Sequence, residues 1–220
     1  DALIGMGFTT FGGPEIEYDD YNFTKLNLPL DHPARDMQDT FYVNDRVVLR
    51  THTSPCEARA LLNVKPPFRL VMPGRVFRVD EVDASHSPGF MQMEGFVVDR
   101  EITLADLKGT LDTFVHAVFG EVRTRFRPSY FPFTEPSAEV DISCSICGGK
   151  GCRVCKGTGW IEILGCGVTN PHELENCGLD PREWKAIAFG IGVDRVTSLK
   201  YGITDIRLEY ENDARFLRQF

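Results

Sequence analysis

Short runs of hydrophobic residues that alternate with polar residues recur along the chain and predict strands. Branched and aromatic side chains dominate these runs, as expected of strands with one face buried. The predicted strands cover residues 68–72, 75–81, 91–98, 122–127, 138–142, 160–164 and 186–190. Two of these strands, 75–81 and 91–98, are joined by a polar loop and predict an antiparallel hairpin.

Helix signals lie between the strand runs. Ser54, Pro55 and Glu57 suit the N-cap, N1 and N3 positions of a helix that runs to about residue 62. Thr103 suits the N-cap of an amphipathic helix to about residue 119, and Gly202 suits the end of a helix over 193–201. Further predictions are a helix end and short strand within 1–14, a short helix over 18–26 and a polar loop over 27–40. The fold class is therefore α+β, with a mostly antiparallel sheet flanked by helices.

Polar residues at two-residue spacing mark the hairpin as a candidate ligand site. Arg78 and Asp80 alternate on the first strand, and Gln92 and Glu94 alternate on the return strand. Because side chains two apart in a strand share a face, we expect these four residues to form one wall.

A second polar motif follows the last predicted strand. Gly190, Gly192 and Arg195 form Gly-x-Gly-x-x-Arg, which resembles a dinucleotide fingerprint but has arginine in place of the third glycine. No convincing second strand and crossover follow, so we reject that interpretation. Either the motif is only a tight turn from strand to helix, or Arg195 covers a nucleotide from the first helical turn.

Four cysteines form a candidate metal site between two predicted strands. Cys144, Cys147, Cys152 and Cys155 are paired as two C-x-x-C groups within 144–157, and glycines at 148, 151 and 157 suit left-handed turns. Four thiolates favour a tetrahedral structural zinc with no open catalytic position. A reduced, empty loop and disulfides are the alternatives. The intervening Lys and Arg residues either contact RNA or are simply solvated.

Composition bounds the remaining possibilities. With 220 residues, 42% of them hydrophobic, the chain can bury the core of one domain. No apolar run approaches the length of a membrane span and no signal peptide is evident, so we expect a cytoplasmic protein. The net charge of −8 is unexpected for a protein that binds nucleic acid on its own.

The hairpin and the glycine motif together resemble motifs 2 and 3 of class II aminoacyl-tRNA synthetases, and further segments resemble the catalytic α subunits of the bacterial phenylalanyl-tRNA synthetases. These segments are Gly13-Pro14-Glu15, His32-Pro33-Ala34-Arg35-Asp36, Arg50-Thr51-His52-Thr53-Ser54, Tyr130 to Pro136, Tyr201 to Arg207 and Phe216 to Phe220. The resemblance implies a class II catalytic domain over 1–220 with the zinc loop inserted at 144–157. It also implies an α2β2 enzyme whose β subunit and an N-terminal helical arm supply much of the tRNA(Phe) contact.

The resemblance implies two reaction steps, formation of phenylalanyl-adenylate from L-phenylalanine and ATP, and transfer of phenylalanine to tRNA(Phe). Arg78 and Arg195 would be the catalytic residues, since they neutralise phosphate charge. ATP would be bound by Arg78, Asp80, His86, Phe90 and Arg195, with the adenine between Phe90 and Arg195.

Phenylalanine recognition divides into an ammonium end and a ring end. The resemblance assigns His52, Ser54, Gln92 and Glu94 to the ammonium, and Phe131, Phe133 and Ala188 to the ring. Alternatively, His52 only caps its own turn, and the two phenylalanines, which we expect to share a strand face around Pro132, belong to the ordinary core.

Two carboxylates are candidates for magnesium, which accompanies ATP. Glu135 matches the family's magnesium ligand, and Glu162, on the strand after the cysteine loop, is a second candidate. The alternatives are a solvated surface position for Glu135 and an ion pair at a strand edge for Glu162.

Three other functions compete with this interpretation. A class II paralogue could act as a regulatory module that does not charge tRNA, but such proteins usually lose a catalytic arginine. Ile187 stands next to Ala188 where the family usually has Phe, and we expect it to contact the amino-acid pocket, so another amino-acid specificity stays open. A zinc-knuckle RNA-binding protein explains only the cysteine loop.

Overall fold

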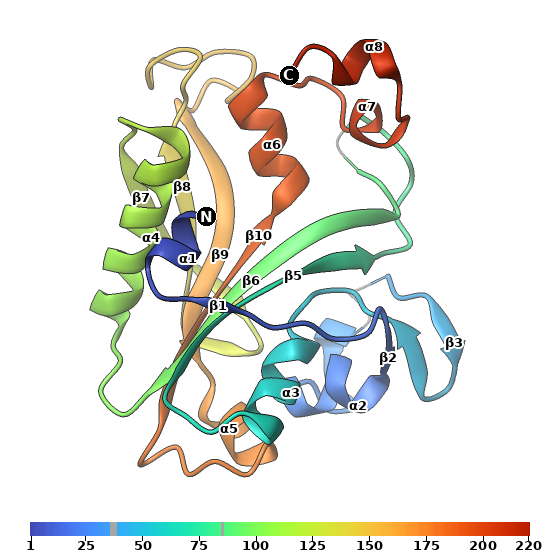
Figure 1. Ribbon diagram of the computed structural model, residues 1–220, viewed down its shortest axis with the longest axis vertical. Helices are drawn as coiled ribbons and strands as arrows, with labels where there is room; N and C mark the ends of the chain where they lie inside the picture. The colour runs from blue at the N-terminus through green and yellow to red at the C-terminus, as the bar shows by residue number, and fades with distance from the viewer. Residues whose placement is uncertain (36–38, 85) are drawn as a thin grey trace.

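The computed structural model describes residues 1–35, 39–84 and 86–220, so Asp36 of the family segment lies outside the described residues. Seven strands form one sheet, and every neighbouring pair except β1 and β5 is antiparallel. The predicted α+β class is confirmed (Figure 1). In sheet order the strands are β1 (Thr9–Thr10), β5 (Phe68–Phe77), β6 (Gly89–Asp99), β10 (Lys185–Gly192), β9 (Trp160–Thr169), β8 (Thr134–Ser143) and β7 (Thr124–Phe131).

Each face of the sheet buries its own hydrophobic core, because neighbouring residues in a strand point to opposite faces. Val97 and Ile187 pack toward α4 (Leu104–Phe119) and α1 (Ala2–Gly5). Phe96 and Ala188, each one residue away, pack toward α3 (Pro55–Asn63) and α5 (Pro171–Asn176). Figure 1 shows α1 and α4 together on one side of the sheet, with α3 and α5 near its lower end.

A small second sheet was not predicted from the sequence. It consists of β2 (Ile16–Tyr18), β4 (Val47–Leu49) and β3 (Tyr42–Asn44), in that order. Each strand has three residues, which is too short for alternation to be recognised. The predicted helix over 18–26 is divided into α2 (Asp19–Asn22) and η1 (Thr24–Leu26), and the predicted loop contains η2 (Pro33–Arg35).

The helix signals differ in outcome. Thr103 and Asp106 form the capping box that starts α4, and Gly202 ends α6 (Val193–Tyr201) with φ of 70°. α3 starts at Pro55 with Ser54 at the N-cap position and Glu57 in the first turn, as predicted, although the side chain of Ser54 makes no cap hydrogen bond. The Ser54 hydroxyl is instead 2.7 Å from Glu94, where it serves the cavity described below. Two further short helices, α7 (Arg207–Tyr210) and α8 (Ala214–Leu217), follow α6.

The first strand of the predicted hairpin wall ends earlier than expected. The predicted strands 68–72 and 75–81 are one strand, β5, which stops at Phe77. Beyond it, the N–H of Arg78 donates to Pro88 and the N–H of Val79 donates to Asp39, so the chain leaves the sheet. Arg78 and Asp80 therefore lie beyond the strand that pairs with Gln92 and Glu94. The predicted four-residue wall is wrong for Asp80, whereas Arg78, Gln92 and Glu94 line one cavity, which is described below.

Candidate functional site

A cavity of about 490 Å³ opens on the sheet between α3, α6 and the hairpin that joins β7 to β8. Its volume is in the range of small-molecule sites. Eleven residues predicted from the sequence line this cavity: His52, Ser54, Arg78, Phe90, Gln92, Glu94, Phe131, Phe133, Glu162, Ala188 and Arg195. The predicted residues that do not line it are Asp80, His86 and Glu135.

Glycines on the central strands leave room for the cavity. Gly190 on β10 pairs with Glu94, and a Cβ atom there would lie 3.3 Å from the amide nitrogen of Gln92. On β9, a Cβ atom at Gly165 would lie 2.8 Å from the ring of Phe131. These positions need glycine because larger residues would displace the side chains that form the walls.

The polar end of the cavity is a chain of hydrogen-bonding groups. The Ser54 hydroxyl lies 2.7 Å from Oε1 of Glu94 and 2.6 Å from Nδ1 of His52, and Nε2 of His52 lies 2.9 Å from the carbonyl oxygen of Asn22. All of these side chains are buried. Oε2 of Glu94 and Oε1 of Gln92 are buried as well, and neither accepts a hydrogen bond from the described residues.

The number of hydrogens available to these hydrogen-bonded groups decides which of them is protonated. The carbonyl of Asn22 can only accept, so Nε2 of His52 carries a hydrogen. The Ser54 hydroxyl has one hydrogen and donates it to Oε1 of Glu94, which leaves Nδ1 of a neutral His52 without a donor. Ser54 can donate to Nδ1 only when Glu94 is protonated and donates to Ser54 instead. Burial lowers the pKa of His52 to about 4, helped by the nearby Arg78 and Arg50. Burial also raises the pKa of Glu94 to about 7, against the hydrogen bond that the Ser54 hydroxyl donates to it. The proton therefore favours Glu94 over His52 below neutral pH.

Two further buried carboxyl groups lie beside this end of the cavity, and the sequence analysis missed both. Glu57 on α3 lines the cavity, and Glu173 on α5 is fully buried. Both oxygens of Glu173 are buried, and neither accepts a hydrogen bond from the described residues. The neighbouring carboxyl group is that of Glu57. Burial raises the pKa of Glu173 to about 8, and burial together with the charge of Glu173 raises that of Glu57 well above its ordinary value. The pair must share a proton to be hydrogen-bonded.

The other end of the cavity is aromatic. The rings of Phe131 and Phe133 are parallel, with centroids 6.1 Å apart, and Phe133 is stacked on His52 at 5.8 Å. Phe131 ends β7, and Phe133 lies in the turn before β8. The predicted alternation on one strand face is therefore wrong, because the hairpin turn brings the two rings together.

Ala188 lines the cavity from β10, whereas Ile187 packs in the core under α4 on the opposite face of the sheet. The expectation that Ile187 contacts the amino-acid pocket is therefore wrong. Its substitution for Phe leaves the residues that line the cavity unchanged.

Two arginines border the cavity. The Arg78 guanidinium lies 5.1 Å from the centre of the Phe90 ring, and its Nε donates to the carbonyl of Thr51. Burial lowers the pKa of Arg78, although Asp80 and Glu94 oppose this shift. Arg195 lies on the first turn of α6, as predicted, and its side chain is exposed. The lining of the cavity thus includes two cationic side chains.

The loop after β5 holds Asp80 and His86 outside the cavity. The N–H of Asp80 donates to the carbonyl of Arg78, and the exposed His86 ring lies 3.0 Å from Asp83. Their predicted contacts with ATP stay predictions.

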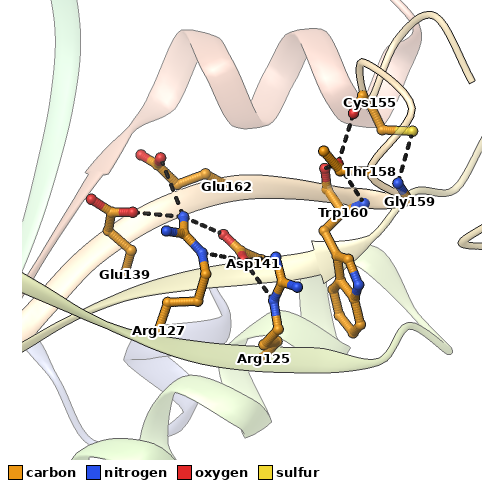
Figure 2. A network of polar contacts seen from close by, with 9 residues as sticks. All are labelled: Arg125, Arg127, Glu139, Asp141, Cys155, Thr158, Gly159, Trp160 and Glu162. Atoms are coloured by element: carbon orange, nitrogen blue, oxygen red, sulfur yellow. Dashed lines mark hydrogen bonds and ion pairs between the residues drawn. The ribbon is translucent and has the colours of Figure 1, made fainter. Parts of the chain in front are cut away.

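The carboxylates near the open end come from β8 and β9. Glu139 and Glu162 both line the cavity, and Arg127 on β7 lies 2.6 Å from Glu139 and 3.8 Å from Glu162 (Figure 2). Glu135 is exposed at the start of β8, so its predicted role as a magnesium ligand stays untested. The sequence analysis missed Glu139, although this residue lies within the predicted strand over 138–142.

The four cysteines of the loop between β8 and β9 converge. All four sulfur atoms lie within 4.8 Å of one another, and the Cys144–Cys152 and Cys147–Cys155 separations are both 3.8 Å. Four thiolates at about 2.3 Å from a tetrahedral zinc are about 3.8 Å apart, so the residues fit this metal. Gly148, Gly151 and Gly157 have positive φ, as predicted. Burial disfavours the Cys155 thiolate, but N–H groups of Cys152 and Gly159 donate to it and lower its pKa to about 6.

The other three cysteines, Cys56, Cys166 and Cys177, are buried and free, and burial raises the pKa of each thiol. Among the described residues, no helix has the length and apolar character needed to cross a bilayer.

Comparisons with known proteins agree with this site. Residues 1–220 match the family model for the tRNA synthetases class II core domain (F). The chain is 61% identical to the phenylalanine–tRNA ligase alpha subunit of Clostridium beijerinckii, over 100% of this chain and 65% of that protein. It is also 61% identical to the same subunit of Clostridium perfringens, over 99% of this chain and 65% of that protein. The chain thus spans about 65% of the length of these relatives. It belongs to the family of class II tRNA synthetase core domains, as the resemblance of its motifs predicted.

Proposed function

We propose that this chain activates L-phenylalanine with ATP and transfers it to tRNA(Phe), as the catalytic part of a phenylalanine–tRNA ligase α subunit. The observation that carries this proposal is the pair of buried acceptors, Gln92 Oε1 and Glu94 Oε2, which receive no hydrogen bond from the described residues. An α-ammonium group supplies up to three N–H donors and a positive charge. Buried acceptors without donors are costly, so a ligand that supplies donors gains affinity at this position.

The aromatic end of the same cavity suits the phenyl ring. Phe131 and Phe133 present parallel ring faces, and Ala188 leaves space on the sheet side. Aromatic pairs prefer offset or edge-to-face contacts, which the edges and faces of these rings offer. A ligand with an ammonium at one end and a benzene ring at the other therefore matches both ends.

The chemistry requires no protein nucleophile. An oxygen of the phenylalanine carboxylate attacks the α-phosphorus of ATP, the bond to the bridging oxygen breaks, and pyrophosphate leaves. Arg78 and Arg195 border this region and would stabilise the charge on the phosphates. In the second step, a ribose hydroxyl of the tRNA attacks the carbonyl carbon, its proton is lost, and AMP leaves.

Carboxylates at the open end support a magnesium site for the nucleotide. Glu139 and Glu162 line the cavity near Arg195, and the charge of Arg195 acts on Glu162. Magnesium supplies charge neutralisation on the phosphates and takes carboxylate oxygen ligands. We propose Glu162 and Glu139 as the residues that hold the metal in this chain and keep Glu135 as the candidate indicated by the family motif.

The four-cysteine loop is proposed to hold a structural zinc. The sulfur separations fit tetrahedral coordination, and four protein ligands leave no position for a substrate. We propose a cytoplasmic protein, because reduced cysteines of this kind persist where thiols stay reduced.

The partners follow from the relatives and from charge. The relatives are named as alpha subunits, so we propose a β subunit as the partner in an α2β2 enzyme. The net charge of −8 opposes binding of a polyanion. Much of the tRNA contact is therefore assigned to other parts of the assembly.

ATP–pyrophosphate exchange with each of the twenty amino acids tests the proposal. We expect exchange with phenylalanine and at most about a hundredfold weaker exchange with tyrosine, because an apolar pocket rejects an added hydroxyl only moderately. Exchange with another amino acid alone would show a different specificity. ATP and phenylalanine binding without exchange would favour the regulatory paralogue.

A further inference from the structure

A continuous ionic network lies on the face of β7, β8 and β9 that borders the cavity. Asp141 on β8 is 1% exposed and accepts hydrogen bonds from two arginines of β7. Arg125 donates to it from Nη2 at 2.6 Å and Nε at 2.9 Å, and Arg127 donates from Nε at 2.6 Å and Nη2 at 3.0 Å. A buried carboxylate with two cations is fully compensated, so each arginine has a fixed place.

Arg127 connects this buried group to the cavity. Its Nη2 atom, which also reaches Asp141, lies 2.6 Å from Glu139 and 3.8 Å from Glu162. Figure 2 shows the two glutamates converging on the Arg127 guanidinium. The position of Arg127 therefore determines where both cavity carboxylates lie.

Arg125 connects the same buried group to the four-cysteine loop. Its guanidinium lies 4.5 Å from the centre of the Trp160 ring, and Trp160 is the first residue of β9 after the loop. The Thr158 hydroxyl is hydrogen-bonded to the backbone of both Trp160 and Cys155. The N–H of Gly159 donates to the Cys155 sulfur at 3.2 Å (Figure 2). An unbroken series of contacts thus runs from a metal-ligating cysteine to the cavity.

We propose that the four-cysteine loop is a positioning element for the cavity carboxylates. The metal of the loop fixes the positions of Cys155 and Trp160, and Trp160 holds Arg125 against Asp141. Because Arg125 shares the charge of Asp141, Arg127 can also bind Glu139 and Glu162 and so position them for the divalent cation of the nucleotide. This inference rests on the proposed function of the cavity. The residues of the network are positioning residues, because none of them lines the cavity except the two glutamates.

The direction of the effect follows from the cost of an unpaired buried charge. Without Arg125, Asp141 would keep only the two hydrogen bonds of Arg127. The Nη2 atom of Arg127, which lies 3.0 Å from Asp141 and 2.6 Å from Glu139, would then be drawn toward Asp141, because an undercompensated buried carboxylate is strongly destabilising. Arg127 would then lose its hydrogen bond to Glu139. The cavity carboxylates would be less well placed for a cation, while the amino-acid end would stay unchanged.

Arg125→Ala and Arg123→Ala form a matched pair for the test. Arg123 covers the same Trp160 ring at 5.4 Å, but the hydrogen bonds of Asp141 come from Arg125 and Arg127. Both variants are made in the full-length chain assembled with its partner. Magnesium is titrated in the exchange reaction, and binding of the Mn²⁺ complex of ATP is followed by electron paramagnetic resonance.

We expect Arg125→Ala to raise the half-saturating concentration of both cations by about tenfold, the effect of losing one charge-assisted hydrogen bond. The half-saturating cation concentration of Arg123→Ala should stay within about twofold of that of the wild type. Arg125→Lys should recover part of the loss, and the dissociation constant of phenylalanine should not change. A fall in turnover with unchanged cation dependence would instead show a merely structural role and overturn the proposal.

Removal of the loop metal tests the other end of the network. A chelator that prefers zinc to magnesium should shift the cation dependence of the wild type as Arg125→Ala does and shift Arg125→Ala no further. Additive effects of the chelator and the substitution would overturn the proposal.

If Arg125→Ala does not fold, a comparison of Trp160→Leu with Trp160→Phe tests the same contact between Trp160 and Arg125. Failure of phenylalanine exchange in the wild type would reject the proposed function, while Mn²⁺–ATP binding would still report on the network.

Discussion

Glu94 combines two requirements that conflict in an empty cavity. It must be ionised to hold an ammonium group, yet burial raises its pKa to about 7. When Glu94 is ionised and His52 is neutral, the single hydrogen of the Ser54 hydroxyl cannot serve both of these neighbours. A bound ammonium would relieve this conflict by donating to Oε2 and stabilising the carboxylate. Ligand binding and ionisation of Glu94 are therefore linked.

This linkage predicts that phenylalanine binds more tightly as pH rises through about 7, the pKa that burial gives Glu94. The pKa is raised, so Glu94 is neutral below it, and affinity should fall by up to about tenfold per pH unit on the acidic side. Isothermal titration between pH 5.5 and 8, where the amine of phenylalanine stays protonated, measures this. Glu94→Gln should bind more weakly and lose the pH dependence. A wild-type affinity that does not change with pH would contradict the assignment.

Arg78 and Arg195 predict a separate loss in the chemical step. Their charges would stabilise phosphate charge that develops during the reaction, so replacing either with alanine should reduce adenylate formation by on the order of a hundredfold or more. Exchange kinetics in the assembled enzyme measure the loss, and circular dichroism checks the fold. Arg182→Ala, which removes an exposed arginine paired with Asp180, serves as the control. Near wild-type exchange by Arg78→Ala or Arg195→Ala would reject these roles.

At the scale of elements, the four-cysteine loop is the clearest case of a local motif that specifies its own structure. Two C-x-x-C groups and glycines with positive φ predicted a loop whose four sulfur atoms converge, and they do so. We expect one zinc per chain. Metal analysis of reduced protein should give this ratio, and Cys147→Ser or Cys155→Ser should lower both the zinc content and the unfolding temperature. Cys177→Ser, outside the loop, should retain the zinc. A wild-type protein without zinc would refute the prediction.

The helices α3 and α5 meet through Glu57 and Glu173, and this contact predicts a stability that depends on pH. Both pKa values are raised above the unfolded value, that of Glu173 to about 8. The favourable contribution of such groups is complete below their unfolded pKa and is lost as pH rises through the folded pKa. Between pH 5.5 and 8.5 the wild type should lose roughly 3 kcal/mol of unfolding free energy through Glu173, because each pH unit below its folded pKa contributes about 1.4 kcal/mol.

Urea unfolding of two variants isolates the pair from other titrating groups. Glu173→Gln removes one buried charge and should lose less stability over this pH interval than the wild type. Glu175→Gln, on the exposed side of the same helix, should behave as the wild type. Parallel pH dependence of Glu173→Gln and the wild type would show that the pair does not determine the effect.

Sequence patterns predicted elements well where the signal is local. Alternation located the seven-stranded sheet apart from the details of its strand ends, and Thr103 and Gly202 fixed ends of α4 and α6. The end of β5 at Phe77 could not be predicted, because the N–H of Val79 donates to Asp39, which is distant in the sequence. The same holds for Ser54, whose local sequence favours a helix cap while its hydroxyl serves Glu94, forty residues away.

At the scale of the whole molecule, the family motifs predicted most of the cavity lining, but its supporting residues were invisible in the sequence. Arg127, Asp141 and Glu173 act through partners on other elements, and no local pattern marks such pairs. The sheet explains how these residues meet. Its middle strands carry the cavity, whereas β7 and β8 carry the ionic network toward the cysteine loop. The residues that line the cavity and the residues that support them therefore lie on the same sheet.

The charge of the whole chain predicts how the two proposed reaction steps depend on the proposed β subunit. The cavity contains the residues proposed for adenylate formation, but a net charge of −8 opposes contact with tRNA, whose binding gains from cationic neutralisation of phosphates. We expect residues 1–220 alone to charge tRNA(Phe) at least about a hundredfold more slowly than the full-length chain with its β subunit, because phosphate contacts dominate such affinities.

Aminoacylation and pyrophosphate exchange, measured on the same samples at two salt concentrations, distinguish the two steps. In the assembled enzyme, added salt should raise the Michaelis constant for tRNA steeply, because each phosphate contact adds to the salt dependence, while the constant for phenylalanine should change little. Robust charging by residues 1–220 alone would place the tRNA contacts on this chain. In that case, cationic side chains such as Lys150, Arg153 and Lys156 of the cysteine loop would be the first to replace with glutamine.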